Sequence, residues 1–144
     1  MPGDLRSVKS YYGLRDYSGN VLIPCEFDYL DWKNDSLIVL SKDNLQALYQ
    51  SNGRKLTAFN YKVIDDFVEG LAKVRVGDRY GFLDSKGKVT IPVELEYCET
   101  FNHGLAMIRK NDKWGAIDKT GKLVIDAKFD YDAVKRMIAE KYGS

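Results

Sequence analysis

The sequence predicts an all-β protein built from about four tandem repeats and closed by one C-terminal helix. Three observations lead to this fold class: a period in the sequence, turn residues at the same place in each period, and a helical pattern after the last one. The period is the constant interval, thirty-four positions long, between the turn glycines Gly19, Gly53, Gly87 and Gly121. So regular a spacing predicts four copies of one three-stranded β unit, with the last copy incomplete.

The copies run over residues 12–45, 46–79, 80–113 and 114–131, and we treat residues 1–144 as one domain. Other landmarks repeat with the same period. An aromatic-Gly pair opens the first, third and fourth copies, and Gln46-Ala47 stands in its place in the second. We call positions separated by one or more whole periods equivalent. The aromatic-Gly pairs are Tyr12-Gly13, Tyr80-Gly81 and Trp114-Gly115.

The third copy shows the elements expected in each unit. Residues 80–83 predict a strand, and Asp84 to Gly87 predict a tight turn, in which Asp accepts backbone N–H groups and Gly supplies a positive φ. Residues 89–91 predict a second strand that Pro92 limits, because proline has no N–H. Residues 105–110 predict a third strand, followed by a two-residue hairpin turn. Three strands a copy give about eleven to thirteen strands in all.

The aromatic-Gly pair is expected to have a packing role. Glycine weakens a strand because it has no side chain to bury. A neighbouring aromatic ring can cover the glycine and restore buried area. Trp114 is therefore interpreted as a ring that covers Gly115, not as part of a reactive site.

Both ends of the array differ from its middle. Residues 132–142 predict a helix that caps the last sheet, as repeat arrays require, with Asp130 or Asp132 at its start and Gly143 at its end. Residues 5–8 align with the third strand of a preceding copy, so we expect a remnant strand that pairs with residues 12–15. The apolar stripe of the helix consists of Val134, Met137, Ile138 and Tyr142.

Composition narrows the class of protein. Apolar residues make up 44% of the chain and charged residues 30%, as in ordinary globular proteins. No long apolar run predicts a membrane span, and no secretory signal is visible, so we expect a cytoplasmic protein. The 22 basic residues nearly balance the 21 acidic ones, which gives no reason to expect nucleic acid as a partner. Cys25 and Cys98 are far apart and are expected to be reduced.

The repeat resembles that of the WG-repeat proteins, a bacterial family named for a recurrent Trp-Gly pair. The resemblance covers about residues 12 to 131 and implies an all-β repeat module without catalytic residues. The second copy departs from the pattern at Gln46-Ala47 and Thr57-Ala58, so the resemblance is weakest for the local geometry there. The matching segments of the third copy are Tyr80-Gly81-Phe82-Leu83-Asp84, Gly87, Ile91-Pro92, Glu96-Tyr97 and Gly104-Leu105-Ala106.

No residue pattern predicts catalysis, a cofactor or a metal. His103 is the only histidine and aligns with Glu69 and Asp35, which predicts a solvated loop position rather than a zinc ligand. The Asp-x-x-Gly turn is too short for a calcium loop. Paired carboxylates for glycoside chemistry are conceivable, but a solvated sheet face is the simpler interpretation of Glu94, Glu96 and Glu99.

Because no pattern predicts catalysis, a cofactor or a metal, the function class that we expect is a binding module. We expect one that engages a protein, for example by scaffolding or neutralising a bacterial partner. The alternative is a module that binds carbohydrate or a cell-surface glycan, suggested by ten Tyr and two Trp in a β-rich chain. Exposed rings aligned along one face would favour sugar, whereas one aromatic anchor with charged neighbours would favour protein.

The first copy departs most from the pattern, around Trp32. It carries three basic and six acidic residues, a charge of −3, whereas the second copy, with six basic and four acidic residues, carries +2. We predict that Trp32 is an interface anchor with Asp28, Asp31 and Asp35 as its rim, and that the partner surface is basic. The alternative is that Trp32 is shifted by one position and fills the core space of Phe67 and Phe101.

Overall fold

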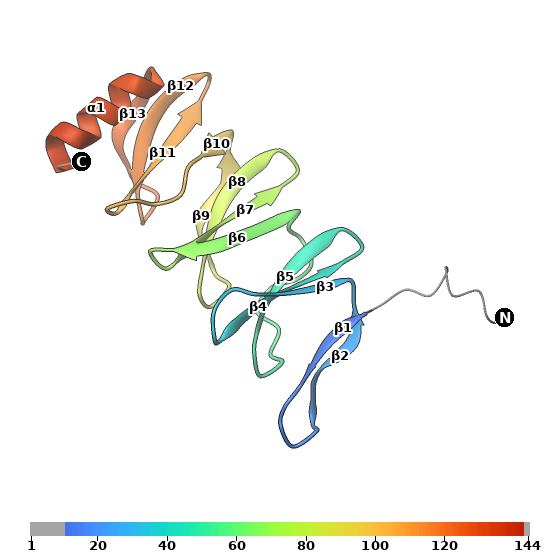
Figure 1. The fold of residues 1–144 in the computed structure, drawn as a ribbon. Helices are drawn as coiled ribbons and strands as arrows, with labels where there is room; N and C mark the ends of the chain where they lie inside the picture. Colours follow the sequence, from blue (N-terminus) through green and yellow to red (C-terminus); the bar gives the residue numbers. More distant parts are fainter. Residues whose placement is uncertain (1–10, 143–144) are drawn as a thin grey trace. The chain divides into compact units, whose positions relative to one another are not determined.

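We analysed a computed structural model, which describes residues 11–142 (Figure 1). In this part of the chain there are thirteen strands and one helix. The helix, α1, spans Tyr131–Tyr142. The strands are β1 (Tyr12–Arg15), β2 (Val21–Phe27), β3 (Tyr29–Trp32), β4 (Leu37–Lys42), β5 (Leu45–Gln50), β6 (Val63–Val68), β7 (Leu71–Val76), β8 (Arg79–Asp84), β9 (Val89–Leu95), β10 (Tyr97–Cys98), β11 (Leu105–Lys110), β12 (Lys113–Asp118) and β13 (Leu123–Phe129).

The chain forms two compact units that divide after Asn60. The first unit contains the two-stranded sheet β1-β2 and the three-stranded sheet β3-β4-β5. The second contains two four-stranded sheets, β6-β7-β8-β9 and β10-β11-β12-β13, and then α1. Within each sheet, every strand pairs antiparallel with its neighbour in the chain. The all-β class with one C-terminal helix is as the sequence predicts.

Each four-stranded sheet combines the end of one copy with the beginning of the next. A complete copy contributes four strands, one more than predicted. The additional strand, represented by β3, β6 and β10, precedes the strand predicted at residues 105–110 and its equivalents. In the third copy it was missed because β10 has only two residues, too few for a visible alternation.

The turns adopt the predicted conformations. The carboxylate of Asp84 accepts the N–H groups of Lys86 and Lys88, both at 2.9 Å, and Gly87 has a φ of +82°. In the hairpin between β11 and β12, Asn111 and Asp112 both have positive φ, as a type I′ turn requires. Because the side-chain oxygen of Asp16 or Asp118 makes the same hydrogen bonds, this turn geometry recurs in three copies.

The aromatic-Gly pair has a different cause from the one predicted. At Gly115 the register of β12 and β13 shifts, so that this residue faces a bulge in β13. A Cβ atom on Gly115 would lie 2.8 Å from the backbone nitrogen of Ala127 and would also collide with the carbonyl oxygen of Ile125. Gly13 and Gly81 face the same close approach. The glycine is therefore required by the neighbouring backbone, and coverage by the ring is not what selects it.

This bulge also explains why the strand after the turn is longer than predicted. We expected a strand that stops at Ile91, but β9 continues through Pro92 to Leu95. The proline lies on the outer strand of the sheet and opposite Gly81, where the ladder is interrupted. Its missing N–H therefore costs no ladder hydrogen bond.

The second copy lacks this outer strand. Ala47, fully buried, stands where the other copies have glycine. The segment that follows makes a single bridge, between Tyr49 and Lys55, and the N–H groups of Leu56 and Thr57 both donate to the carbonyl of Leu48. Since the methyl group of Ala47 occupies the space that the approaching backbone needs, the departure noted in the sequence has a direct structural consequence.

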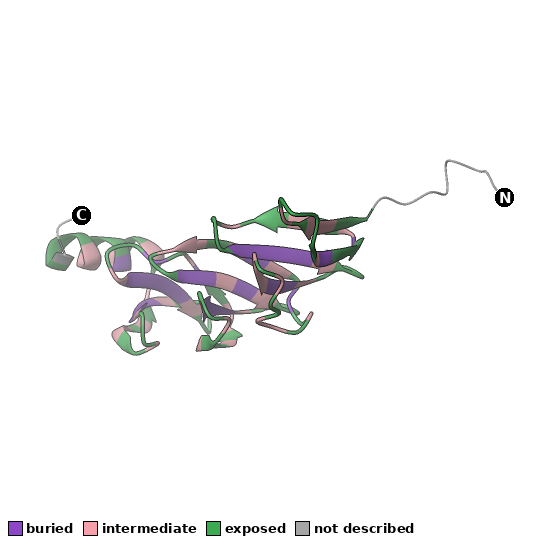
Figure 2. Ribbon diagram, turned by 90° about the horizontal axis from the view of Figure 1, so that it is seen from below, coloured by how far each residue is buried: buried purple, intermediate pink, exposed green. Residues whose placement is uncertain are grey.

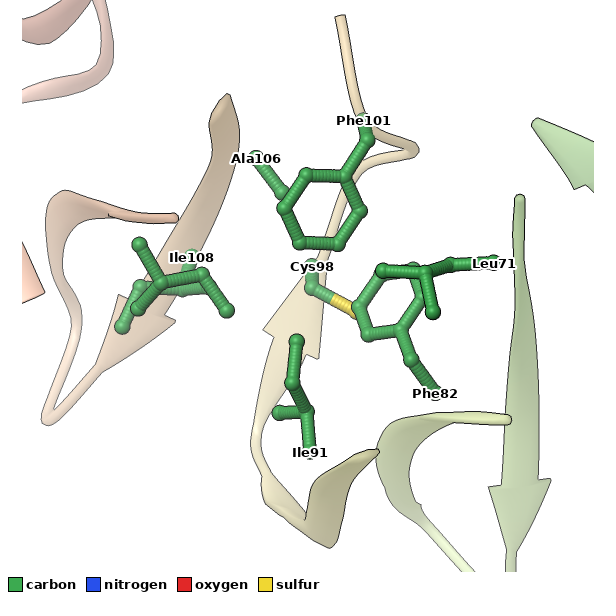
Figure 3. Packing of buried hydrophobic residues seen from close by; sticks show 8 residues of the cluster. Leu71, Phe82, Ile91, Cys98, Phe101, Ala106 and Ile108 are labelled. Carbon is green, nitrogen blue, oxygen red and sulfur yellow. The ribbon is translucent and has the colours of Figure 1, made fainter. Parts of the chain in front are cut away.

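The core is densest along the middle strands of the sheets. Residues Leu37 to Leu40 of β4 and Leu105 to Ile108 of β11 are all buried, so both faces of these strands are covered (Figure 2). In the second unit, Phe82 and Phe101 meet edge to face at 4.8 Å, with Cys98 beside them (Figure 3). Continuous burial of this kind explains why period-two alternation is weak in the strand sequences.

Helix α1 covers the last sheet. The carboxylate of Asp130 accepts the N–H of Ala133 at 2.7 Å, which identifies Asp130 as the N-cap. Val134 is fully buried against Met107 and Ala116, with Ile138 packed beside it. The side chain of Tyr142, the predicted helix end at Gly143 and the predicted remnant strand at residues 5–8 lie outside the described residues.

We predict that deletion of residues 132–144 causes self-association or unfolding. Removing α1 exposes the apolar face on which Val134 and Ile138 pack, and each such side chain contributes about 1.5–3 kcal/mol. Light scattering and thermal denaturation measure the effect, and Val134→Asp in the full chain should act in the same direction. A truncated protein that stays monomeric with an unchanged Tm would contradict this role of the helix.

We also predict that Gly115→Ala lowers the free energy of unfolding by about 1–3 kcal/mol, as overpacking does. The added methyl group meets the backbone of β13, which cannot rotate away as a side chain can. Lys113→Ala in the same strand is the control, because Lys113 is exposed. Equal stability of the two variants in urea denaturation would show that the close approach is not needed.

Candidate binding site

The copies provide their own comparison, because equivalent residues occupy equivalent places. In the second unit an aromatic residue recurs at every half period, and the rings contact one another in a row that we call the aromatic ladder. Its members are Tyr80, Tyr97, Trp114 and Tyr131, with ring centroids 5.5, 6.0 and 4.9 Å apart and interplanar angles of 78–80°. Each ring therefore meets the next edge to face, a favourable geometry for aromatic packing.

Polar groups contact the aromatic ladder at both of its ends and hold the rings in place. The ammonium group of Lys73 lies 5.6 Å from the ring centre of Tyr80 and 5.5 Å from that of Tyr97, and it donates to the carbonyl of Cys98. The hydroxyl of Tyr131 donates to Glu99 at 2.7 Å, and this hydrogen bond is the main reason that the pKa of Tyr131 is raised to about 12. These contacts, together with the edge-to-face packing of the rings, explain the aromatic ladder as part of the folded structure.

The repeated geometry agrees with a comparison against family models. The model described as "WG containing repeat" matches residues 12–45, 48–80, 80–114 and 114–133. The chain belongs to this family. No curated protein and no solved structure matches the chain. The four matches correspond to the four copies predicted from the sequence.

The first WG repeat exposes aromatic rings that the later repeats do not have or do not expose. Trp32 is 49% exposed at the end of β3, where the equivalent residues are Asp66 and Thr100. It lies on the same face of its sheet as Leu30, and the register places Ile38 opposite it. Exposure of this size shows that the alternative of a buried Trp32 in the core is wrong.

The space of Phe67 and Phe101 is instead taken by Lys33. Its side chain is only 6% exposed, and its ammonium group lies 3.0 Å from a carboxylate oxygen of Asp31. The aliphatic stem of a lysine can replace part of an aromatic side chain while its charge stays paired. Trp32 is therefore not needed to fill the core.

The three predicted rim residues do not surround Trp32 evenly. Asp31 alternates to the opposite face of β3 and pairs with Lys33. Asp28 lies before the other end of β3, about 13 Å away along an extended strand, and accepts the N–H of Asp43 at 3.1 Å. Asp35 is exposed in the bend that follows Trp32. Asp31 and Asp35 are therefore close to Trp32 in the sequence, whereas Asp28 lies at a second location in the first repeat.

That second location is a shallow pocket of about 290 Å³, which we call the first-repeat pocket. A pocket of about 300 Å³ in the third repeat is its equivalent, and we call it the third-repeat pocket. Five lining positions of the first pocket coincide with lining positions of the second after a shift of two whole periods. The paired residues are Tyr11 and Arg79, Glu26 and Glu94, Asp28 and Glu96, Lys42 and Lys110, and Asp43 and Asn111.

Equivalent loops also contact each other in the second unit. The carboxylate of Glu69 accepts the N–H groups of His103, at 2.7 Å, and Gly104, at 2.9 Å, and lies 3.7 Å from the ammonium group of Lys119. The hydrogen bond from Gly104 is the largest cause that lowers the pKa of Glu69. His103 is exposed, as predicted, but its backbone has a function in holding two repeats together.

The remaining candidate residues have structural partners. Glu96 and Glu99 are half-buried and hydrogen-bonded, so the prediction of a wholly solvated carboxylate face holds only for Glu94. Burial raises the pKa of the Cys98 thiol to about 12, whereas Cys25 is exposed. Within residues 11–142 no group of three or more potential ligands is placed to hold a metal ion. The one described helix is too short to cross a membrane.

We predict that Glu69→Gln destabilises the protein by about 1 kcal/mol at neutral pH, because a neutral amide accepts the two N–H groups more weakly. The pKa of Glu69 is lowered by folding, so its contribution is complete above its ordinary value near 4.5 and is lost as the pH falls through the lowered pKa. The difference between the two proteins should therefore shrink in acid.

Urea denaturation between neutral and acid pH measures this difference. Glu140→Gln, on the exposed surface of α1, is the matched control and should leave stability unchanged throughout. A constant difference between Glu69→Gln and the wild type over the whole range would exclude an ionised carboxylate as its source.

Proposed function

We propose that this WG-repeat chain is a non-catalytic binding module for another protein, with Trp32 as the anchor. The observation that carries the proposal is the exposure of a tryptophan at a position where the other repeats have Asp66 and Thr100. Because the buried side chain at the position of Phe67 and Phe101 is Lys33, Trp32 is not the residue that fills that position in the core. Tryptophan is the residue type most enriched in binding hot spots.

The charge around the anchor supports a basic partner surface. The first repeat carries a charge of −3, and Asp31 and Asp35 flank Trp32 in the chain. Acidic rim groups steer a basic partner towards the interface and fix its orientation. Since Asp31 is 66% exposed while it pairs with Lys33, its carboxylate still faces solvent.

The non-catalytic part of the proposal is supported by the shifted carboxylates. The pKa values of Asp16, Glu69 and Asp118 are lowered, and each carboxylate accepts hydrogen bonds within a turn or between loops. These interactions stabilise the ionised form, whereas a general acid or base needs a pKa near the working pH. The hydrogen bonds of the folded chain therefore account for each lowered pKa.

One observation favours the carbohydrate alternative. The rings of Tyr12 and Tyr29, 46% and 67% exposed, are stacked with centroids 6.1 Å apart and an interplanar angle of 22°. Trp32, however, alternates to the other face of β3 from Tyr29, and the ladder rings in the second unit stand nearly perpendicular to one another. This arrangement supports a protein surface better than a flat platform for sugar rings. A glycan array tests the alternative.

The experiment is affinity capture of native partners by wild-type protein and by Trp32→Ala and Asp31→Lys. We expect Trp32→Ala to abolish capture of a stoichiometric partner while the Tm stays nearly unchanged, because the ring is half exposed. Asp31→Lys should weaken capture, and wild-type capture should fall with salt.

Leu123→Ala is the matched control, because Leu123 is 43% exposed and lies in the last repeat. It should capture the partner as the wild type does. A fall in Tm corresponding to about 3–5 kcal/mol for Trp32→Ala would identify a core residue and refute the anchor. Equal capture by Trp32→Ala and wild type would refute it as well.

A further inference from the structure

The first-repeat and third-repeat pockets share a framework. In each pocket an acidic residue accepts the N–H of the first residue of the following hairpin turn. Asp28 accepts from Asp43 at 3.1 Å, and Glu96 accepts from Asn111 at 2.6 Å. A second acid, Glu26 or Glu94, lines each pocket. Both pockets thus have an acidic residue at these two places, and they differ in the cations and in one further carboxylate that accompany them.

The third-repeat pocket contains its own guanidinium group. Nε of Arg109 lies 3.9 Å from Oε1 of Glu96, and Arg79 lines the same pocket. Two carboxylates, Glu94 and Glu96, therefore face the positive charges of Arg79, Arg109 and Lys110, and the pocket has a charge of +1. The third-repeat pocket thus places a guanidinium group beside its two carboxylates, and Nε of Arg109 is buried there without a hydrogen bond of its own.

The first-repeat pocket lacks both arginines. Tyr11 stands in place of Arg79, and Ser41 stands in place of Arg109. Asp43 replaces Asn111 and adds a third carboxylate, so the pocket has a charge of −2 with Lys42 as its only lysine. The ammonium group of Lys42 lies 5.8 Å from the ring centre of Phe27. The equivalent pockets therefore differ in the sign of their charge, +1 in the third repeat and −2 in the first.

Aromatic rings border the place of the missing arginine. In β11, Arg109 stands opposite Tyr97 of β10, and in β4, Ser41 stands opposite Tyr29 of β3. Tyr29 is 67% exposed and Tyr11 is 49% exposed. A guanidinium group can stack on such rings while it donates to carboxylates in a planar, forked arrangement. Tyr11 lines the first-repeat pocket with the carboxylates, and Tyr29 follows Asp28 in the chain.

We propose that the first-repeat pocket binds an arginine side chain of the partner protein, in the position that Arg109 occupies in the third repeat. This inference rests on the proposed function, because it names the chemistry of that partner. Tyr11 and Asp28 also make other contacts of their own. A guanidinium group carries five N–H donors, and a carboxylate accepts several hydrogen bonds.

The test uses three blocked pentapeptides of Gly with a central Arg, Lys or citrulline, each titrated into the ¹⁵N-labelled protein. The Arg peptide should give saturable shifts of the amide signals of Asp43 and Asn44. Citrulline has the shape of arginine without its charge and should give none. The Lys peptide should bind more weakly, because an ammonium group lacks the forked geometry. Equal shifts with the Arg and citrulline peptides would overturn the proposal.

Two reciprocal variants make the test specific. Ser41→Arg rebuilds the arrangement of the third repeat and should abolish peptide binding. Arg109→Ser with Arg79→Tyr opens the third-repeat pocket and should create a second site, seen as new shifts at Asn111 and Asp112. Glu26→Gln should weaken binding about fivefold, as loss of one solvated ion pair does. If Ser41→Arg does not fold, the gain of a site in the double variant still decides the question, and its absence refutes the proposal.

The outcome is separable from that of the proposed function. A Ser41→Arg protein that loses the peptide but still captures the partner through Trp32 leaves the binding module intact and shows that the partner uses no arginine there, which overturns this inference. A chain that binds the Arg peptide but captures the same proteins with Trp32→Ala as with the wild type refutes the tryptophan anchor alone.

Discussion

The repeat depends on a close approach of two backbones. At Gly13, Gly81 and Gly115 the outer strand of the sheet passes so near that a Cβ atom would collide with it. This contact allows the outer strand to bulge and continue past its proline or its equivalent, as β2, β9 and β13 do. Where Ala47 replaces the glycine, the outer strand is reduced to one bridge. The three copies that have the glycine thus have the full outer strand, and the copy that has alanine does not.

The same constraint accounts for how the aromatic residues are used. The ring that precedes each glycine packs against the next aromatic residue of the repeat pattern in the chain direction. In the second unit this produces the ladder from Tyr80 to Tyr131, in which each ring has an edge-to-face neighbour. In the first unit Tyr12 stacks on Tyr29, and both remain substantially exposed. The exposure of Tyr12 and Tyr29 is therefore what a ladder with few members leaves behind.

The fold was largely predictable from the sequence, because repeated turns have local chemistry that one copy confirms for another. The Asp84 to Gly87 turn and the strand at 105–110 follow from residue types alone. The glycine bulge was not predictable, since it depends on a strand further along the chain. The sequence also did not predict that Lys33, at the position equivalent to Phe67, has a buried side chain. A lysine at residue 33 suggests a surface position, and only the paired carboxylate of Asp31 allows its stem to be buried.

The candidate site was predicted in part, and for a reason that applies to other repeat proteins. Trp32 stands out because equivalent residues are polar, and a comparison within one chain detects such a departure. The pocket around Asp28 did not stand out, because Glu96 and Asp130 are acidic too and the acid itself is structural. What distinguishes the first repeat from the third is Tyr11 in place of Arg79 and Ser41 in place of Arg109, two differences that only the folded register brings together. In an array whose copies share one framework, a side chain that one copy lacks can therefore alter its surface as much as a side chain that it alone carries.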